Sequence, residues 1–134
     1  MTVAILERLS GHPTLKAPEQ LPSGLTGGDA VLIGVLVLVL APVAEETFFR
    51  GFLFRAIRER HGFWYAGATS AVVFGLVHWS PDSSGLSNLV LVIPLAFVGL
   101  GLAYVYERRR NLLVNIAAHA TFNAVGFLYY LKVL

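Results

Sequence analysis

The sequence predicts an all-α membrane protein, a polytopic transmembrane bundle of four membrane-spanning helices. Of its 134 residues, 56% are hydrophobic and only 13% are charged, whereas soluble domains contain about 25% charged residues. The apolar residues form long blocks, and a helix of about 20 residues crosses the hydrocarbon layer. Clusters of arginine separate these blocks in a pattern that indicates membrane topology. A soluble helical core would not require this sidedness.

The N-terminal segment, residues 1–28, is predicted to lie outside the membrane. Its apolar run at residues 3–6 is followed by Glu7 and is too short for the hydrophobic region of a signal peptide. Residues 10–28 contain three prolines with serine and glycine, which is typical of a surface linker. We therefore expect a linker, with room for a short interfacial helix before it, and a membrane core at residues 29–134.

The first span is expected from Asp29, a favourable N-cap residue, to about Arg58. It is long for one crossing, and Pro42 is expected to kink it because proline lacks a backbone N–H. Three ionisable residues interrupt its apolar sequence: Glu45, Glu46 and Arg50. Ionisable groups at membrane depth cost roughly 2.5–3.5 kcal/mol each on insertion scales and are usually functional.

Within this trio, Glu46 and Arg50 lie four residues apart, so they share a helix face and can pair. Glu45 points about 100° away from Glu46 and is the carboxylate without a local partner. The pair also has a purely structural interpretation, since buried ion pairs can make helix packing specific. An unpaired buried carboxylate is harder to explain by packing, so Glu45 is the preferred functional candidate.

The second span is predicted at about Phe63–Trp79 and the third at about Leu86–Tyr106, with a polar turn between them. In the second span, Ser70, Phe74 and His78 recur at intervals of four and share one face. A single histidine near a helix end is more often interfacial or bonded to the backbone than functional. The third span has no ionisable group within its apolar run, so we expect it to provide packing and a cavity wall.

The fourth span is predicted at about Leu112–Leu131. Asn115, His119 and Asn123 recur there at intervals of four and form a polar stripe on an apolar helix. Such a stripe can simply hold helices together by hydrogen bonds, and Asn115 has no other argument in its favour. However, spans one, two and four all carry polar groups that avoid lipid only by facing one another. The sequence therefore predicts a shared, water-accessible polar cavity.

The arginines predict the orientation of the bundle. The two clusters are Arg55, Arg58 and Arg60, at the connection between spans one and two, and Arg108, Arg109 and Arg110, between spans three and four. Two crossings separate the clusters, so both lie on one side, which the positive-inside rule identifies as cytoplasmic. The turn around Asp82 then lies on the opposite side. The net charge of +2 is small and gives no indication of a nucleic-acid partner.

A carboxylate, two imidazoles and a carboxamide suit the hydrolysis of an amide by activated water. Glutamate can act as the general base, and Asn with a neighbouring His can donate hydrogen bonds to the oxyanion of the tetrahedral intermediate. The absence of cysteine excludes disulfides, cysteine nucleophiles and thiolate metal sites. The sequence contains neither a serine nucleophile elbow nor a P-loop, either of which would indicate a different chemistry.

Three motifs carry a family resemblance: Glu45-Glu46-x-x-x-Arg50, Phe74-x-x-x-His78 and His119-x-x-x-Asn123. In this order they resemble the motifs of the CPBP family, which comprises CAAX prenyl proteases of the Rce1 type and bacteriocin-processing or bacteriocin-immunity relatives, and is also called the Abi family. The resemblance extends from about residue 39 to residue 126. It implies a multi-pass protein of a prokaryotic cell (inner) membrane, acting as an intramembrane glutamic-type endopeptidase.

The resemblance also implies the roles of individual residues. By motif position, Glu45 would activate the water and His78 would help to position it. His119 and Asn123 would form the oxyanion hole. The substrate would be a peptide or protein in or at the membrane, either a CAAX-type prenylated protein or a bacteriocin-related one, and the oligomeric state stays open.

The resemblance implies two further roles. Glu46 would orient the site as the partner of Arg50, and Phe74 would pack under His78. Family members commonly carry further helices before the first motif, so the chain is interpreted as a fragment or a minimal core.

Helix rise places His119 roughly 12 Å from the cytoplasmic end of its span and His78 roughly 24 Å along its own span. Tilt, a kink or a shifted helix boundary must bring the two together.

Alternatives stay open for cofactor and function. Glu45, His78 and His119 could form a three-ligand zinc site, although no His-Glu-x-x-His motif is present, and a mechanism without a cofactor is favoured. A second class of function is a non-catalytic membrane scaffold or bacteriocin-immunity protein with the same fold. A third interpretation, a proton or ion path, lacks a second ionisable relay toward the opposite side.

Overall fold

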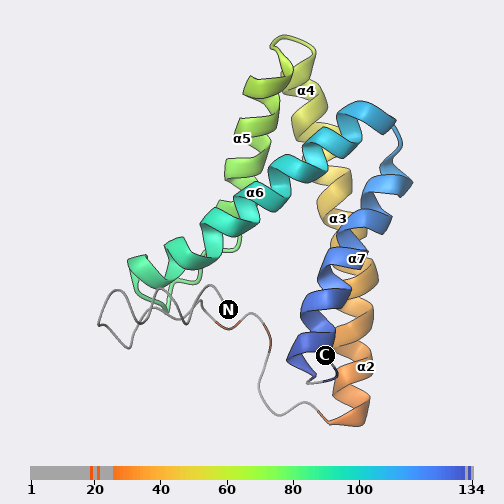
Figure 1. Cartoon of the computed structure of the whole chain (residues 1–134), viewed down its shortest axis with the longest axis vertical. Coiled ribbons are helices and arrows are strands. Elements are labelled where there is room, and N and C mark those ends of the chain that lie inside the picture. Colours follow the sequence, from red (N-terminus) through yellow and green to blue (C-terminus); the bar gives the residue numbers. More distant parts are fainter. Residues whose placement is uncertain (1–18, 20, 22–25, 132, 134) are drawn as a thin grey trace.

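The computed structural model describes residues 19, 21, 26–131 and 133. Within this part, the ordered elements are all helical (Figure 1). The first helix is continuous from Gly27 to Arg58. Its consecutive parts are α2 (Gly27–Val35), the π-helical segment η1 (Leu36–Leu40), α3 (Ala41–Glu46), the π-helical segment η2 (Thr47–Phe54) and α4 (Arg55–Arg58). Three further helices follow: α5 (Phe63–Leu76), α6 (Gly85–Arg109) and α7 (Leu112–Tyr130).

The helices form an open bundle rather than a closed cylinder. α7 lies alongside η1 and α3, and α5 packs on α6 and on η2. The lower ends of α5 and α6 diverge from the lower ends of α2 and α7 (Figure 1). The pair α5 and α6 therefore meets the first helix and α7 only in the middle and upper parts of the molecule. α3 and η2 lie in this region.

Three helices are long and apolar enough to cross a membrane, namely Gly27–Arg58, Gly85–Arg109 and Leu112–Tyr130. The predicted helical membrane bundle is therefore confirmed. α5 is a shorter apolar helix of 14 residues, or about 21 Å, against a hydrocarbon layer of about 30 Å.

The prediction that the second helix continues to Trp79 was wrong. The backbone N–H groups of His78 and Trp79 bond three residues back, to Gly75 and Leu76, so the chain tightens into a turn. Pro81 follows, and the residue before a proline avoids the helical conformation.

The start of the first helix also differs from the prediction. The N-cap is Thr26, not Asp29. Asp29 lies in the first turn, where its carboxylate accepts a hydrogen bond of 2.7 Å from the Thr26 hydroxyl and lies near the positive end of the helix dipole. The N-terminal linker predicted before this point falls almost wholly outside the described residues.

Close packing of α5 on α6 depends on small residues. A Cβ on Gly75 would lie 2.6 Å from the carbonyl oxygen of Val92, and one on Gly99 would lie 3.1 Å from the ring of Phe74. A side chain at Gly75 would collide with backbone, which cannot yield without moving α6. The two helices can therefore approach this closely only because glycine occupies the contact, as in other membrane helix pairs.

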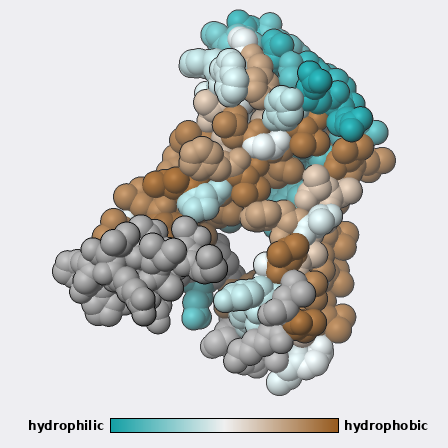
Figure 2. All heavy atoms as spheres, viewed as in Figure 1, coloured by the Kyte–Doolittle hydropathy of each residue, from teal (hydrophilic) through white to brown (hydrophobic). Residues whose placement is uncertain are grey.

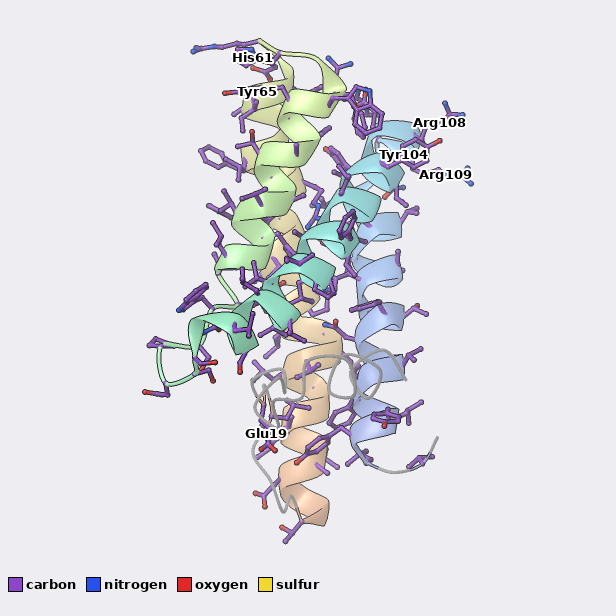
Figure 3. All side chains as sticks on the ribbon, turned by 60° about the vertical axis from the view of Figure 1, so that its left-hand side comes forward. Glu19, His61, Tyr65, Tyr104, Arg108 and Arg109 are labelled. Carbon is purple, nitrogen blue, oxygen red and sulfur yellow. The ribbon has the colours of Figure 1, made fainter. Side chains whose placement is uncertain are left out.

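The surface has the sidedness that the arginines predicted. Hydrophobic residues cover the middle of the molecule and hydrophilic residues gather at its upper end (Figure 2). His61 on one side and Arg108 and Arg109 on the other all lie at this end (Figure 3), so the loops after α4 and α6 are at the same end of the bundle. Leu32, Phe52 and Phe97 on the flanks are 65–72% exposed, as expected of side chains that face lipid.

Candidate active site

The centre of the candidate site is Glu46, whose side chain is fully buried. Its Oε1 accepts a hydrogen bond of 2.8 Å from Nη1 of Arg50 and lies 2.9 Å from Nδ1 of His119. Its Oε2 accepts one of 2.8 Å from Nδ2 of Asn115. A buried carboxylate is tolerated only with such partners, because desolvation of an unpaired charge is costly. Glu46 therefore ties the first helix to α7.

Arg50 extends this network to α6. It is completely buried, and its Nη2 donates a hydrogen bond of 2.7 Å to the carbonyl oxygen of Gly99. Its guanidinium also lies 5.0 Å from the centre of the Phe74 ring on α5, within the range of a cation–π contact. The predicted pairing of Glu46 with Arg50 is confirmed, and the pair joins all four helices through these contacts.

Glu45 is the neighbouring carboxylate that takes no part in this hydrogen-bond network. Its Oε2 is buried and has no hydrogen-bond partner among the described residues, as the helix geometry predicted. That oxygen lies 3.8 Å from Nε2 of His119, and the Glu45 side chain is 27% exposed. The carboxylate is therefore reachable from outside the bundle while one of its oxygens faces the imidazole.

The bond with Glu46 fixes the state of the His119 ring. Because a carboxylate only accepts hydrogen bonds, Nδ1 of His119 must carry a proton. Nε2 is then an acceptor in the neutral ring and a donor in the doubly protonated ring. The ring has a carboxylate on each side, so its second nitrogen faces the place where Glu45 could hold a water molecule.

His78 and His119 both lie close to one aromatic ring, that of Phe74. The Phe74 ring centre is 5.1 Å from that of His78 and 5.6 Å from that of His119. Nδ1 of His78 bonds to the carbonyl oxygen of Phe74 at 2.8 Å, which leaves Nε2 as an acceptor in the neutral ring. Both imidazoles therefore lie near the same ring despite the depth difference estimated from helix rise. α5 ends at Leu76, so His78 lies in the turn after the helix and not within it.

Asn123 lies one turn beyond His119, and its amide is used elsewhere. In η1 the N–H of Ala41 bonds to the carbonyl of Leu36, five residues back, so the next carbonyl, that of Val37, would pair with residue 42. Residue 42 is proline and has no N–H to donate. Nδ2 of Asn123 supplies the missing donor to Val37 at 2.9 Å. Its second amide hydrogen is not used in this bond.

Two buried amides support the site, and neither was among the predicted site residues. Asn115 is buried and donates to Leu102 at 2.9 Å in addition to Glu46. Its spacing of four from His119 was the available signal. Asn88, at the start of α6, accepts from the N–H of Ser80 and donates to its carbonyl, both at 2.8 Å. Asn88 thereby fixes the loop that follows His78. As a neutral amide with no ionisable neighbour in its helix turn, it gave no signal in the sequence.

The described part of the chain contains no group of three or more His, Asp or Glu residues that is placed to hold a metal ion. The three residues considered for zinc, Glu45, His78 and His119, are therefore not placed as a three-ligand set. His119 and His78 each use Nδ1 for a protein hydrogen bond, which leaves Nε2 of each ring free. We assign no step to a metal.

Comparison with known proteins identifies the family. Residues 27–125 match the family model described as type II CAAX prenyl endopeptidase Rce1-like. The chain belongs to the Rce1-like family. The matched range contains every residue of the candidate site and most of the membrane helices, so this Rce1-like chain is a multi-pass membrane protein of a protease family.

Two curated proteins resemble this Rce1-like chain. The "Putative membrane peptidase YdiL" of Bacillus subtilis (strain 168) is 33% identical over 92 residues, which are 69% of this chain and 34% of the relative. An "Uncharacterized 24.3 kDa protein" of Escherichia coli is 28% identical over 103 residues, which are 75% of this chain and 45% of the relative. The chain thus spans between a third and a half of the length of these relatives. No solved structure matches it.

Proposed function

We propose that this chain is the catalytic core of an intramembrane endopeptidase in which Glu45 activates the hydrolytic water. The observation that carries the proposal is the unpartnered buried oxygen of Glu45, 3.8 Å from Nε2 of His119. Every other charge of the cluster has a hydrogen-bonding partner among the described residues, whereas this oxygen has none. The Glu45 side chain is 27% exposed, and a water molecule bound beside it and His119 would have Glu45 as its proton acceptor.

The chemistry follows from this arrangement. Glu45 accepts a proton from the water while the water oxygen attacks the carbonyl carbon of the scissile peptide bond. A doubly protonated His119 donates from Nε2 to the oxyanion, and Glu46 stabilises that ring through Nδ1. When the tetrahedral intermediate collapses, the C–N bond breaks and the proton held by Glu45 passes to the leaving amine. Asn123 has a second amide hydrogen for the oxyanion, and His78 has a free Nε2 for the water.

The substrate is proposed to be a peptide or protein in or at the membrane. The family name and a relative named as a membrane peptidase support this class. A prenylated CAAX-type protein and a bacteriocin-related protein are the two candidates that the family suggests. We also propose that no metal takes part, because no group of three or more His, Asp or Glu residues in the described part of the chain is placed to hold one.

The test uses the protein reconstituted in nanodiscs with a library of peptides and a mass-spectrometric readout. Glu45→Gln should lower cleavage by at least about 100-fold, the range of a lost general base, with little change in thermal stability. Unchanged products would instead support the membrane-scaffold or immunity function. Treatment with a chelator should leave cleavage intact. Loss of activity that zinc restores would contradict the metal-free mechanism.

A further inference from the structure

The arginine-rich end of the bundle has more positive charge than its own carboxylates can neutralise. Six arginines lie in or beside its two loops, against only Glu59 and Glu107. Oε1 of Glu107 accepts from Nη2 of Arg58 at 3.0 Å, and its Oε2 accepts from Nη2 of Arg110 at 2.9 Å. Both oxygens of Glu107 are therefore occupied, and neither serves the two arginines that precede Arg110.

These two arginines, Arg108 and Arg109, form no ion pair with a carboxylate in the described part of the chain. With Tyr104 and Val105 they line a surface hollow of about 430 Å³. The side chains of Tyr104, Arg108 and Arg109 extend outward from the same end of α6 (Figure 3). The hollow is therefore a positively charged concavity on the outer face of the bundle, separate from the Glu46 cluster.

Aromatic side chains place this hollow at the level of lipid headgroups. The guanidinium of Arg108 lies 6.0 Å from the centre of the Tyr104 ring. Phe63 lies edge-on to Tyr104 at 6.2 Å and contacts Trp64 at 5.2 Å, and Trp64 is 74% exposed. Tyr and Trp concentrate at the boundary between hydrocarbon and headgroups, where one part of each ring is apolar and the other is wet.

One face of α6 leads from the hollow into the apolar part of the helix. Phe97, Gly101, Tyr104 and Arg108 follow at intervals of four, three and four, and all four are exposed. Nothing lies within 4 Å of the position that a Cβ would take on Gly101, so this face is open between Phe97 and Tyr104. An extended hydrocarbon chain could lie along it with its polar end at Arg108. A free phosphate ion would make no use of this strip.

We propose that the hollow formed by Tyr104, Val105, Arg108 and Arg109 binds the headgroup phosphate of an anionic glycerophospholipid from the same leaflet. The guanidinium fork of arginine matches two phosphate oxygens. Basic pockets beside membrane helices on the cytoplasmic side are suited to such headgroups. The phosphate would bind between Arg108 and Arg109, the tyrosine ring would cover the glycerol, and one acyl chain would follow Gly101 and Phe97. The site requires only that the chain is embedded in a membrane and does not depend on the proposed protease activity.

Native mass spectrometry of the detergent-solubilised protein tests this site with phosphatidylglycerol and, for comparison, phosphatidylcholine. The variant Arg108→Gln/Arg109→Gln should lower the affinity for phosphatidylglycerol about tenfold or more and leave phosphatidylcholine unaffected. The control Arg55→Gln/Arg60→Gln removes the same charge at the same end but outside the hollow, and should retain binding. Equal losses in both variants would show a diffuse basic surface and overturn the proposal. So would equal binding of the two lipids by the unmodified protein.

Two further arms identify the source of the phosphate. Inorganic phosphate and acyl-free glycerophosphoglycerol should each compete at least about tenfold less well than the intact lipid, because they cannot use the strip on α6. If either competes equally, the site binds an anion and not a lipid, which contradicts the proposal. Thermal melting of each variant distinguishes lost binding from lost folding. Glu45→Gln should bind the lipid as the unmodified protein does, so failure of the protease proposal would leave this result unchanged.

Discussion

Adjacent residues of one type have opposite environments in this site. Glu46 is fully buried with Arg50, Asn115 and His119 as partners, whereas one oxygen of Glu45 has no hydrogen-bond partner among the described residues. The one-residue step of about 100° around the helix axis is sufficient to separate a carboxylate that holds the helices together from one that is outside this network. Stability and proposed catalysis are therefore divided between neighbours.

This division predicts different stabilities for two matched variants. Glu46→Gln removes the charge opposite Arg50 and should destabilise the protein by about 3–5 kcal/mol, since it leaves a buried charge unpaired. Glu45→Gln changes a carboxylate whose buried oxygen has no hydrogen-bond partner in the described part of the chain, and should change stability by less than about 1 kcal/mol. Thermal melting in the same detergent compares them. Equal melting temperatures for the two variants would show that the assignment of roles is wrong.

The sequence predicted the local part of this site and the facing of polar groups from spans one, two and four, but not which amides bond to which partners across the helices. The Glu46–Arg50 pair and the isolation of Glu45 follow from spacing within one helix, which is known before any tertiary structure. Asn115 donates to a carboxylate 69 positions away, and Asn88 holds a loop by backbone bonds. Neutral amides give no local signal of such partners, because their hydrogen bonds depend on how the helices pack.

Among the elements, the first helix lacks one backbone hydrogen-bond donor, and another helix supplies it. Pro42 was expected to produce a kink, and the structure places it directly after η1, at the start of α3. The widened π turn leaves the carbonyl of Val37 without a helical donor, and Asn123 of α7 replaces it. π-helical turns often occur at functional sites, and this one lies just before Glu45.

A double-mutant cycle tests this repair. Asn123→Ala should destabilise the protein by about 1–3 kcal/mol, because the carbonyl of Val37 then loses its partner. In the background of Pro42→Ala, which restores a backbone N–H, the same substitution should cost clearly less. Thermal melting of the four proteins gives the coupling. If Asn123 acts only on the oxyanion, its loss would reduce cleavage without any coupling to Pro42 in stability.

At the scale of the whole molecule, the sequence predicted four helices and the grouping of both arginine clusters at one end, because these depend on composition and on the number of crossings. It placed the end of α5 three residues too late. That error has a physical cause, since Val77, His78 and Trp79 are compatible with a helix and only the turn before Pro81 ends it. α5 is in consequence about 21 Å long, shorter than the hydrocarbon layer.

Whether α5 crosses the membrane can be tested by labelling residues just before and just after it. The chain contains no cysteine, so single substitutions give unambiguous labelling sites. His61→Cys, before α5, should react with a membrane-impermeant maleimide only from the cytoplasmic side, and Ser83→Cys, after it, only from the opposite side. Phe97→Cys, on the lipid-facing flank of α6, is the unreactive control. The tilt of α5, together with the turn at residues 77–80, has to span the remaining thickness, or the bilayer has to thin locally. Labelling of both sites from one side would mean that α5 enters and leaves by the same face, and the arginine clusters would then no longer share the cytoplasmic side.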